Sequence, residues 1–290
     1  MFILNPKSGV QSSVNVPDLI QSNINRTLWE PEIVFTQHAG HATELASAAA
    51  AGGARLVVAV GGDGTVNEVA RGLLKTSSAL GILPKGSGNG LARHLGIPMV
   101  LAHALKTINN PTFGRIDTCS INGHPFFCTS GIGFDGLVSS VFAKSAKRGL
   151  SSYIQLIIRE FRNFVSHSAT LQVNGKELTA NFFVMAFANA SQYGNNAYIA
   201  PMANIQDGFL DVCLIREVGI AEAIQLGYGL LTKQIAHSSL AEFHTCSTVQ
   251  VKSKEAQHFH ADGEYRGQAQ QFEIQLYPSS LEVVAPLVIT

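Results

Sequence analysis

Hydrophobic and polar positions follow two different patterns along this chain, and the pattern changes near residue 115. Before that point, short apolar runs alternate with segments in which apolar residues recur every three or four positions. The runs predict strands at 1–4, 33–35, 56–60 and 81–83, and the periodic segments predict helices at 42–51, 66–74, 91–95 and 99–108. Alternating strands and helices of this kind indicate an α/β domain with a parallel sheet.

After residue 115 the pattern becomes that of β structure. Asn122-Gly123 and Asn174-Gly175 lie between β-rich runs and predict tight hairpin turns. Strands are predicted at 126–130, 170–173, 182–188, 209–215, 248–252 and 272–277, with helices at 150–165 and 220–236. We therefore expect an α/β domain over 1–114 and a mainly antiparallel domain of two packed sheets over 115–280. The apolar segment 281–290 is a candidate to return to the first domain.

Composition narrows the class of protein. Of 290 residues, 46% are hydrophobic and 14% charged, which is enough to bury a sizeable core. Lysine plus arginine equals aspartate plus glutamate at 20 each, so we expect no nucleic-acid partner. The four cysteines form no CxxC pair and predict free thiols in a reducing cytoplasm. The N-terminus lacks the features of a signal peptide, and no apolar run is long enough to span a bilayer.

Two glycine-rich loops carry the chemistry of the first half. The segment 61–65 (GGDGT) follows a predicted buried strand and opens a helix, and 85–90 (KGSGNG) repeats that arrangement after the next strand. Backbone N–H groups at such bends bind phosphate, so the two loops together predict a nucleotide site. A carboxylate beside phosphates is tolerated through magnesium, a bridging water or a substrate hydroxyl, so Asp63 indicates phosphoryl transfer. A simpler interpretation makes Thr65 and Glu68 a helix capping box, but it explains neither Asp63 nor the second loop.

Three further segments have alternative interpretations. The segment 131–136 (GIGFDG) matches a dinucleotide-binding pattern, but its β-rich surroundings favour a tight turn that delivers Asp135 to a cleft. The alternating residues His258, His260, Asp262 and Glu264 leave a metal-dependent hydrolase open. Basic residues at 144, 147 and 148 precede an apolar helical stripe, which is typical either of core packing or of a membrane-binding surface.

The motifs together resemble those of the diacylglycerol kinase-like lipid kinases, which include bacterial lipid kinases and eukaryotic sphingosine and ceramide kinases. The resemblance covers nearly the whole chain and rests on NPKSG (5–9), VFTQHAGHATELA (34–46), GGDGTVNE (61–68), LPKGSGNGLAR (83–93), GIGFDG (131–136), PMANIQDGFLDV (201–212) and ADGEY (261–265). It implies an N-terminal α/β nucleotide-binding domain and a C-terminal β-sandwich lipid-kinase domain, with the active site in the cleft between them. GGDGT alone is shared with NAD kinases and phosphofructokinases, so the later motifs supply the specificity.

The resemblance also implies roles for individual residues. Its ATP contacts fall on Asn5, Thr36, Gly62, Asp63, Gly64, Thr65, Val66, Asn67, Glu68 and Ser87. Asp63 is expected beside the phosphates and the reacting hydroxyl, Glu264 as the proton acceptor, and Asp135 at the lipid head group. A Mg²⁺ site is expected from the Asp207 side chain with the carbonyl oxygens of Asn204 and Phe209. Many bacterial members have an aspartate where this chain has Gly90, so a metal–water network that uses that acid does not follow from the resemblance.

The sequence therefore predicts an ATP- and Mg²⁺-dependent lipid kinase that is cytoplasmic and peripherally associated with the membrane surface. The γ-phosphate would pass to a hydroxyl of a membrane lipid of the diacylglycerol, sphingoid or ceramide, or phosphatidylglycerol type. A non-catalytic nucleotide sensor and a kinase of the NAD kinase type remain as alternatives, and a homo-oligomer stays open.

Overall fold

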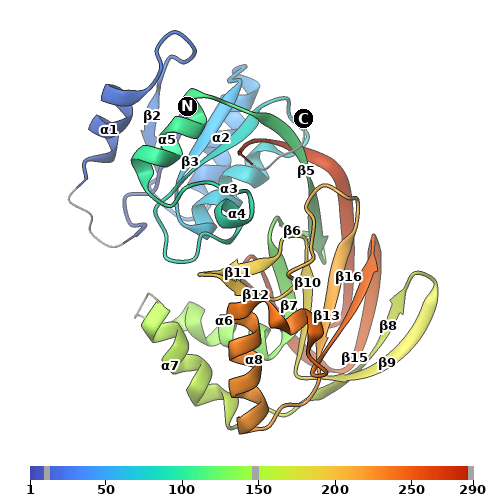
Figure 1. Cartoon of the computed structure of the whole chain (residues 1–290). Coiled ribbons are helices and arrows are strands. Elements are labelled where there is room, and N and C mark those ends of the chain that lie inside the picture. Colours follow the sequence, from blue (N-terminus) through green and yellow to red (C-terminus); the bar gives the residue numbers. More distant parts are fainter. Residues whose placement is uncertain (10–13, 146–149, 287–290) are drawn as a thin grey trace. The chain divides into compact units, whose positions relative to one another are not determined.

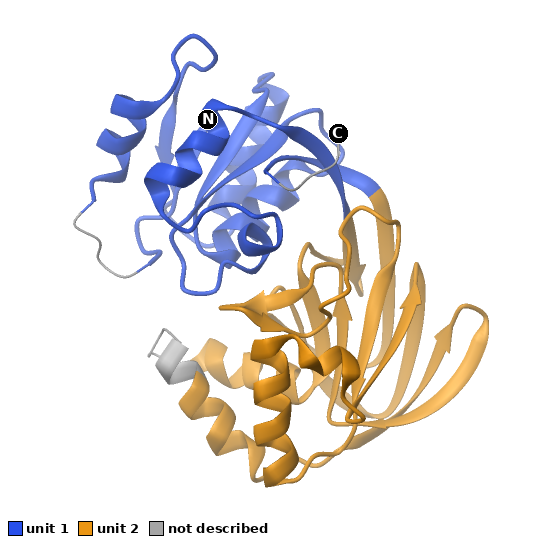
Figure 2. Ribbon diagram, in the orientation of Figure 1, with its two compact units in different colours: residues 1–117, 279–290 blue, residues 118–278 orange. Residues whose placement is uncertain are grey.

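The structure is a computed structural model of the chain, and it describes residues 1–9, 14–145 and 150–286 (Figure 1). It divides into two compact units (Figure 2), which are described one at a time. Unit 1 comprises residues 1–117 and 279–290, and unit 2 comprises residues 118–278. Within the described residues, no helix is both long enough and apolar enough to span a membrane.

Unit 1 is built from parallel strands connected by helices. Its strands are β1 (Phe2–Leu4), β2 (Ile33–Phe35), β3 (Leu56–Gly61) and β4 (Ala79–Pro84). Its helices are α1 (Val16–Asn23), α2 (His41–Ala51), α3 (Asp63–Leu73), α4 (Gly90–His94) and α5 (Leu101–Asn109). The predicted α/β fold with a parallel sheet is confirmed. The sequence did not predict α1, a short helix that begins after Asn15, whose side chain accepts a bond from the backbone N–H of Asp18.

The order of the strands identifies where a ligand would bind in unit 1. The sheet runs β4-β3-β1-β2, with every pair parallel. The chain therefore leaves β1 toward one side for β2 and returns to the other side of β1 for β3. In parallel α/β sheets, ligands bind outside the carboxyl ends of the strands at such a reversal. In unit 1 these are the ends of β1 and β3.

Helices α2 and α3 pack closely because small residues line their contact. Ala42, Ala46 and Ala49 of α2 are buried. A Cβ on Gly72 of α3 would lie 2.5 Å from the carbonyl oxygen of Thr43, so only glycine fits there. This close approach lies near the end of α3, whose first turn carries part of the GGDGT motif.

Two long strands carry the chain across the boundary between the units. These are β5 (Phe113–Ile121) and β16 (Glu264–Val284). The end of β16 pairs in parallel with β4 through Val283 and Leu80, and Leu281, Val283 and Val284 are buried. Of the expected returning segment 281–290, residues 287–290 lie outside the described residues.

Unit 2 is the antiparallel β-sandwich that the sequence predicts. Its other strands are β6 (His124–Phe126), β7 (Thr129–Gly133), β8 (His167–Val173), β9 (Lys176–Phe182), β10 (Val184–Ala188), β11 (Gln192–Gly194), β12 (Ala197–Tyr198), β13 (Leu210–Ile215), β14 (Ala241–Cys246) and β15 (Thr248–Ala261). The main path runs β14-β13-β10-β7-β15-β16, and its pairs are antiparallel. Phe126, Phe182, Phe187 and other buried side chains from these strands form one core. Both predicted hairpin turns are present, since Asn122-Gly123 and Asn174-Gly175 have positive φ values and join paired strands.

Three helices lie along one side of the unit 2 strands in Figure 1: α6 (Phe134–Lys144), α7 (Leu150–Phe161) and α8 (Ile220–Thr232). They pack on a second core cluster, to which β10 and β13 contribute Ala186 and Cys213. The predicted helix at 150–165 ends earlier, at Phe161, and the one at 220–236 ends at Thr232. Lys233 adopts a left-handed conformation (φ 64°), which stops α8 before a 3₁₀ turn at Gln234–His237.

The predicted strand at 126–130 is wrong as one element, because β6 and β7 are separate. The backbone N–H groups of Phe127, Cys128 and Thr129 donate to the carboxylate of Asp262 at 2.8–3.1 Å. These groups therefore bond to a side chain, which interrupts the strand. A pattern of apolar residues carries no information about such a distant partner.

Candidate active site

Three loops converge at the carboxyl ends of the unit 1 strands. Asn5 follows β1, Gly62 separates β3 from α3, and Lys85 opens the loop after β4. The Asn5 N–H donates to the carbonyl oxygen of Val60 at 3.2 Å, and the Lys85 N–H donates to that of Gly61 at 2.7 Å. These backbone bonds hold the three motifs side by side at the reversal of strand order.

Glycine is required where these loops touch. A Cβ on Gly86 would lie 2.5 Å from the Cα atom of Gly62, and a Cβ on Gly9 would lie 2.2 Å from the carbonyl oxygen of Lys85. Real Cβ atoms do not approach other atoms so closely. The glycines of NPKSG, GGDGT and KGSGNG therefore pack the three loops into one cradle beside the start of α3, and glycine-rich loops at a helix start are typical of anion-binding sites.

Asp63 connects the first loop to the second. Its Oδ1 accepts from the N–H of Gly90 at 2.7 Å and its Oδ2 accepts from the N–H of Asn89 at 2.8 Å. Burial raises the pKa of the Asp63 carboxyl group, and these two hydrogen bonds and the charge of Arg93 partly oppose that rise. Gly90 thus contributes a backbone N–H to this network.

The proposed capping box of Thr65 and Glu68 is wrong. Helix α3 begins at Asp63, with Gly62 as its N-cap, so Thr65 already lies inside the helix. The Asn5 side chain donates to Thr65 Oγ1 at 3.2 Å. The Glu68 carboxylate accepts from the backbone N–H groups of Gly40 at 2.9 Å and Ala42 at 3.2 Å, so it caps α2 instead.

The other predicted nucleotide residues lie around this cradle. Thr36 follows β2 and is half-buried, with its N–H bonded to the carbonyl oxygen of Leu4 at 2.8 Å. Ser87 is exposed in the second loop, whereas Val66 and Asn67 are buried in α3 behind the half-buried Gly64. A cavity of about 300 Å³ is lined by Asn5, Val60 and Lys85 among others, at the ends of β1, β3 and β4.

In unit 2, Asp135 lies in the first turn of α6, so the expected tight turn is wrong. Its Oδ2 accepts from the hydroxyl of Tyr193 at 3.2 Å and from Nε2 of His260 at 3.3 Å. His260 Nδ1 accepts from the N–H of Gly263 at 3.1 Å, so the proton of the neutral ring resides on Nε2. Asp135 is buried, and a Cβ on Gly131 would lie 2.0 Å from its Oδ2. The first glycine of GIGFDG, Gly131, therefore leaves room for the Asp135 carboxylate.

Glu264 begins β16, directly after the turn at Asp262 and Gly263. Its Oε2 accepts from Nη2 of Arg266 at 2.5 Å, and its side chain is 39% exposed. The Asp262 carboxylate anchors this turn through the three backbone bonds from 127–129 described above. The backbone that carries Glu264 is thus held in place, while the carboxylate itself is accessible to solvent.

The metal-dependent hydrolase alternative is not supported by the contacts of its four residues. Asp262 accepts backbone bonds, His260 contacts Asp135, and Glu264 pairs with Arg266. His258 contacts the Tyr265 hydroxyl at 3.1 Å and Gln268 Nε2 at 2.9 Å. Among the described residues, the side chains grouped closely enough to hold a metal lie elsewhere, in unit 1.

The predicted magnesium residues lie in the loop before β13. Asn204 Oδ1 accepts from the N–H of Gln206 and Asp207 Oδ1 accepts from that of Phe209, both at 3.0 Å. Burial raises the pKa of the nearby Asp211, and the negative charge of Asp207 raises it further. No ion pair within the described residues neutralises Asp207. An exposed carboxylate in an acidic, oxygen-rich loop fits a hard cation such as Mg²⁺.

The sequence analysis did not predict the polar side chains that contact Asp135 and Glu264. These are Tyr193, His260 and Arg266. The alternation in QHFHADGEY singled out His260, but for a metal role. Nothing in the sequence pointed to Tyr193, because 58 residues separate it from its partner Asp135.

An α/β unit in which three glycine-rich loops meet and an antiparallel β-sandwich unit define a class of two-domain proteins. Residues 1–121 match the family of the diacylglycerol kinase catalytic domain, and residues 129–285 match the YegS C-terminal NAD kinase beta sandwich-like domain. The chain belongs to this diacylglycerol kinase and YegS family of lipid kinases. It is accordingly an enzyme of the lipid kinase class, a phosphotransferase with an alcohol group as acceptor, and the family implies use of ATP.

Two curated relatives are similar to this chain over nearly its full length. The chain is 28% identical to a Pseudomonas putida protein named probable lipid kinase YegS-like, over 99% of this chain and 95% of the relative. It is 27% identical to the diacylglycerol kinase of Bacillus subtilis, over 98% of this chain and 95% of that protein.

Solved structures share the fold. A diacylglycerol kinase from Bacillus anthracis superposes with a TM-score of 0.75 at 20% identity, covering 99% of this chain and 96% of that one. An NAD kinase from Archaeoglobus fulgidus, solved in complex with ATP, has a TM-score of 0.54 at 13% identity over 97% of this chain and 92% of that one. At these identities the likeness concerns the fold alone.

Proposed function

We propose that this protein transfers the γ-phosphate of ATP, bound with Mg²⁺, to a hydroxyl group of a membrane lipid. The observation that carries the proposal is the three-loop cradle of unit 1. It lies at the reversal of strand order, where parallel α/β sheets bind ligands, and Asp63 joins two of its loops. An anionic polyphosphate is the ligand that such a site suits.

The proposed nucleotide contacts are the predicted residues that surround this cradle: Asn5, Thr36, Gly62, Asp63, Gly64, Thr65, Val66, Asn67, Glu68 and Ser87. The buried members act through the backbone or through their neighbours. Glu68, for instance, binds the N–H groups of Gly40 and Ala42 and so orients the start of α2. Asp63 holds the second loop against the first, and its charge favours Mg²⁺ and a hydroxyl donor close to the phosphates.

Glu264 is the proposed proton acceptor. The lipid oxygen attacks the γ-phosphorus while its proton passes to a Glu264 carboxylate oxygen, and the bond from the γ-phosphorus to the ADP oxygen breaks. The ion pair with Arg266 orients the carboxylate, and its partial exposure keeps it accessible to a substrate. Direct transfer of this kind needs no covalent phosphoenzyme.

Mg²⁺ is proposed at the Asp207 side chain and the carbonyl oxygens of Asn204 and Phe209. There it would neutralise the carboxylates of Asp207 and Asp211 and stabilise the loop. Asp135 is proposed to face the lipid head group. Its Oδ1 is bonded only to the adjacent N–H of Gly136 among the described bonds, so it can accept a further hydrogen bond.

The acceptor is proposed to be a lipid of the diacylglycerol, sphingoid or ceramide, or phosphatidylglycerol type, reached from the cytoplasmic membrane surface. Helix α8 supports peripheral binding. Ile220, Ile224, Tyr228 and Leu231 recur along one face and are 63–72% exposed, while Leu226 and Leu230 pack on the core. A helix with an apolar outer face suits the boundary between lipid head groups and acyl chains. Lys147 and Arg148 of the predicted basic segment lie outside the described residues.

The test is transfer of labelled γ-phosphate from ATP–Mg²⁺ to a panel of hydroxyl lipids in mixed micelles, with NAD as an additional acceptor. We expect one labelled lipid, with activity reduced about 10²–10⁴-fold in Glu264→Gln and also lost in Asp63→Asn. Glu273→Gln, an exposed acid on the same strand β16, serves as the matched control and should retain activity.

Three outcomes separate the alternatives. ATP binding without any labelled product would favour a nucleotide sensor, and labelled NADP would favour an NAD kinase. A product rate unchanged in Glu264→Gln would leave the kinase intact but exclude Glu264 as the proton acceptor.

A further inference from the structure

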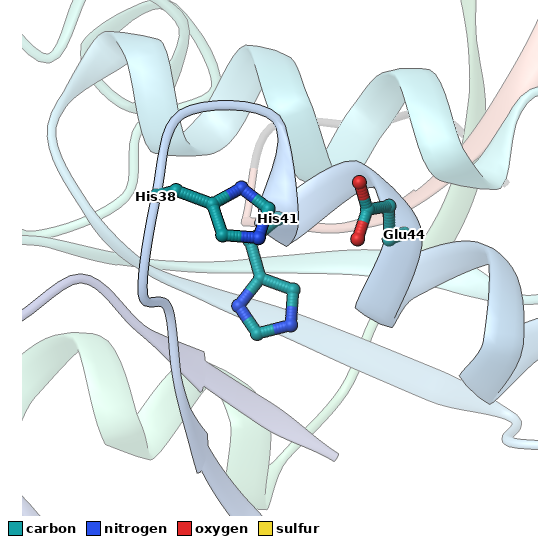
Figure 3. A group of neighbouring side chains, drawn as sticks. All are labelled: His38, His41 and Glu44. Atoms are coloured by element: carbon teal, nitrogen blue, oxygen red, sulfur yellow. The ribbon is translucent and has the colours of Figure 1, made fainter.

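His38, His41 and Glu44 form a group of side chains that the proposed kinase reaction does not use (Figure 3). His38 lies in the loop after β2, His41 is the first residue of α2, and Glu44 lies in its first turn. One ligand atom from each side chain lies within 4.8 Å of the other two. His41 and Glu44 are three residues apart in α2 and lie on one side of it, and the preceding loop brings His38 beside them.

We propose that these three residues bind a divalent transition metal of the zinc type. Two imidazole nitrogens and one carboxylate oxygen are ligands that Zn²⁺, Ni²⁺ and Cu²⁺ prefer. Mg²⁺ prefers oxygen ligands alone, so this site is chemically distinct from the proposed magnesium loop in unit 2. Water would complete the coordination, since two of the three side chains are exposed and the third is half-buried.

A hydrogen bond of the His38 ring determines which of its nitrogens is free to bind a metal. Its Nδ1 lies 3.0 Å from the carbonyl oxygen of Ala39, and because a carbonyl can only accept, Nδ1 carries the proton. The lone pair of the neutral ring is therefore on Nε2. Metal-binding histidines are held in the same way, by a bond from the other ring nitrogen to a carbonyl or carboxylate.

Glu44 and His41 complete the set in different ways. The Glu44 carboxylate has no hydrogen bond or ion pair with the described residues, so both its oxygens are available. His41 stacks on His38 with ring centroids 4.8 Å apart, so one of the two rings must rotate before both can coordinate the same ion. The Nδ1 of His41 accepts from the N–H of Gln37 at 3.1 Å. Coordination through Nδ1 would use this lone pair, and coordination through Nε2 would move the ring proton onto Nδ1. Either route breaks the bond to Gln37, which makes the Gln37 N–H a specific reporter.

The site adjoins the segment that leads to the cradle of unit 1. Gly40 and Ala42, which flank His41, donate their N–H groups to Glu68 of α3, and Gln37 follows Thr36 directly. A bound metal would therefore fix the loop that carries Thr36. The existence of the metal site does not depend on kinase activity.

The experiment is calorimetric titration of tag-free full-length protein with Zn²⁺ in a non-chelating buffer, without ATP. We expect one ion per chain, and affinity at least tenfold weaker in His38→Gln, His41→Gln and Glu44→Gln. His103→Gln is the matched control, because His103 is exposed on α5 of the same unit. Each variant is checked for folding by circular dichroism.

A second measurement follows the amide signals of labelled protein by NMR. Zn²⁺ should shift the Gln37 N–H in the wild type and in His103→Gln but leave it unchanged in His41→Gln. Equal Zn²⁺ affinity in the wild type and the three site variants, or no binding at all, would overturn the proposal. Neither result would bear on lipid phosphorylation, which is measured separately with Mg²⁺.

Discussion

At the scale of single residues, Asp63 shows how one carboxylate can hold two loops together. Both of its oxygens accept backbone N–H bonds from the second glycine loop. An asparagine of the same size would direct its NH₂ group at one of these donors, leaving that N–H unsatisfied. Asp63→Asn is therefore expected to displace the second loop as well as remove a charge.

His94 of α4 gives a prediction about pH. Burial lowers the pKa of its imidazole from 6.5 to about 4, so between these values the unfolded chain is protonated and the folded chain is not. The unfolding free energy should therefore fall by about 3 kcal/mol from this residue as the pH drops through that window.

The measurement is urea unfolding of the wild type and His94→Gln between pH 7 and pH 4. The variant lacks the titrating group, so the difference between the two unfolding free energies should change by that amount. Parallel curves over the whole range would show that burial of His94 does not couple to stability.

At the scale of elements, glycines set the distances between helices and loops. Gly72 allows α3 to contact α2, whereas Gly227 in α8 has open space where a Cβ would stand. Both are glycines inside helices, where alanine has the better helix propensity. They differ only in what surrounds them.

This difference predicts opposite effects of one substitution. Gly227→Ala should stabilise the protein by about 0.5–1 kcal/mol through helix propensity. Gly72→Ala should destabilise it by about 1–3 kcal/mol, because the new Cβ would overlap Thr43 and Ala46. Urea unfolding followed by circular dichroism measures both, and a stabilised Gly72→Ala would contradict the close packing of α2 and α3.

The limits of several elements depend on partners that lie far away in sequence. The gap between β6 and β7 exists because Asp262 takes the backbone bonds of 127–129. Likewise, the TxxE pattern predicted a capping box, but Glu68 binds the start of α2 instead. In both cases the local pattern predicted the type of element, a strand or a helix, correctly. Tertiary contacts decided where each element ends and what its side chains bind.

At the scale of the whole molecule, unit 1 is assembled from both ends of the chain. The last strand, β16, leaves unit 2 and pairs with β4 through Val283 and Leu80. Leu281 and Val284 are buried there as well. The stability of unit 1 therefore depends on the segment that carries Leu281, Val283 and Val284.

The proposed membrane contact through α8 is tested with the whole protein and vesicles of phosphatidylcholine and phosphatidylglycerol. Ile224→Glu combined with Tyr228→Glu should weaken sedimentation with vesicles at least about tenfold, because two apolar side chains no longer enter the interface. Val100→Glu changes an apolar residue of unit 1 that is also largely exposed, and it serves as the control. Unchanged vesicle binding would exclude α8, and loss of a dimer in place of vesicle binding would identify its partner as a second copy.

The sequence by itself determined the two kinds of fold, the order of the motifs and the family, because periodicity and short glycine-rich loops are local properties of the chain. Only the tertiary structure decided that Asp63 joins two loops, that Asp135 is held by Tyr193 and His260, and that Glu68 caps α2. Each of these contacts unites residues more than 20 positions apart, and a single sequence carries no signal for the distance between them. Backbone donors within buried loops must find acceptors, and the fold determines which side chain supplies them.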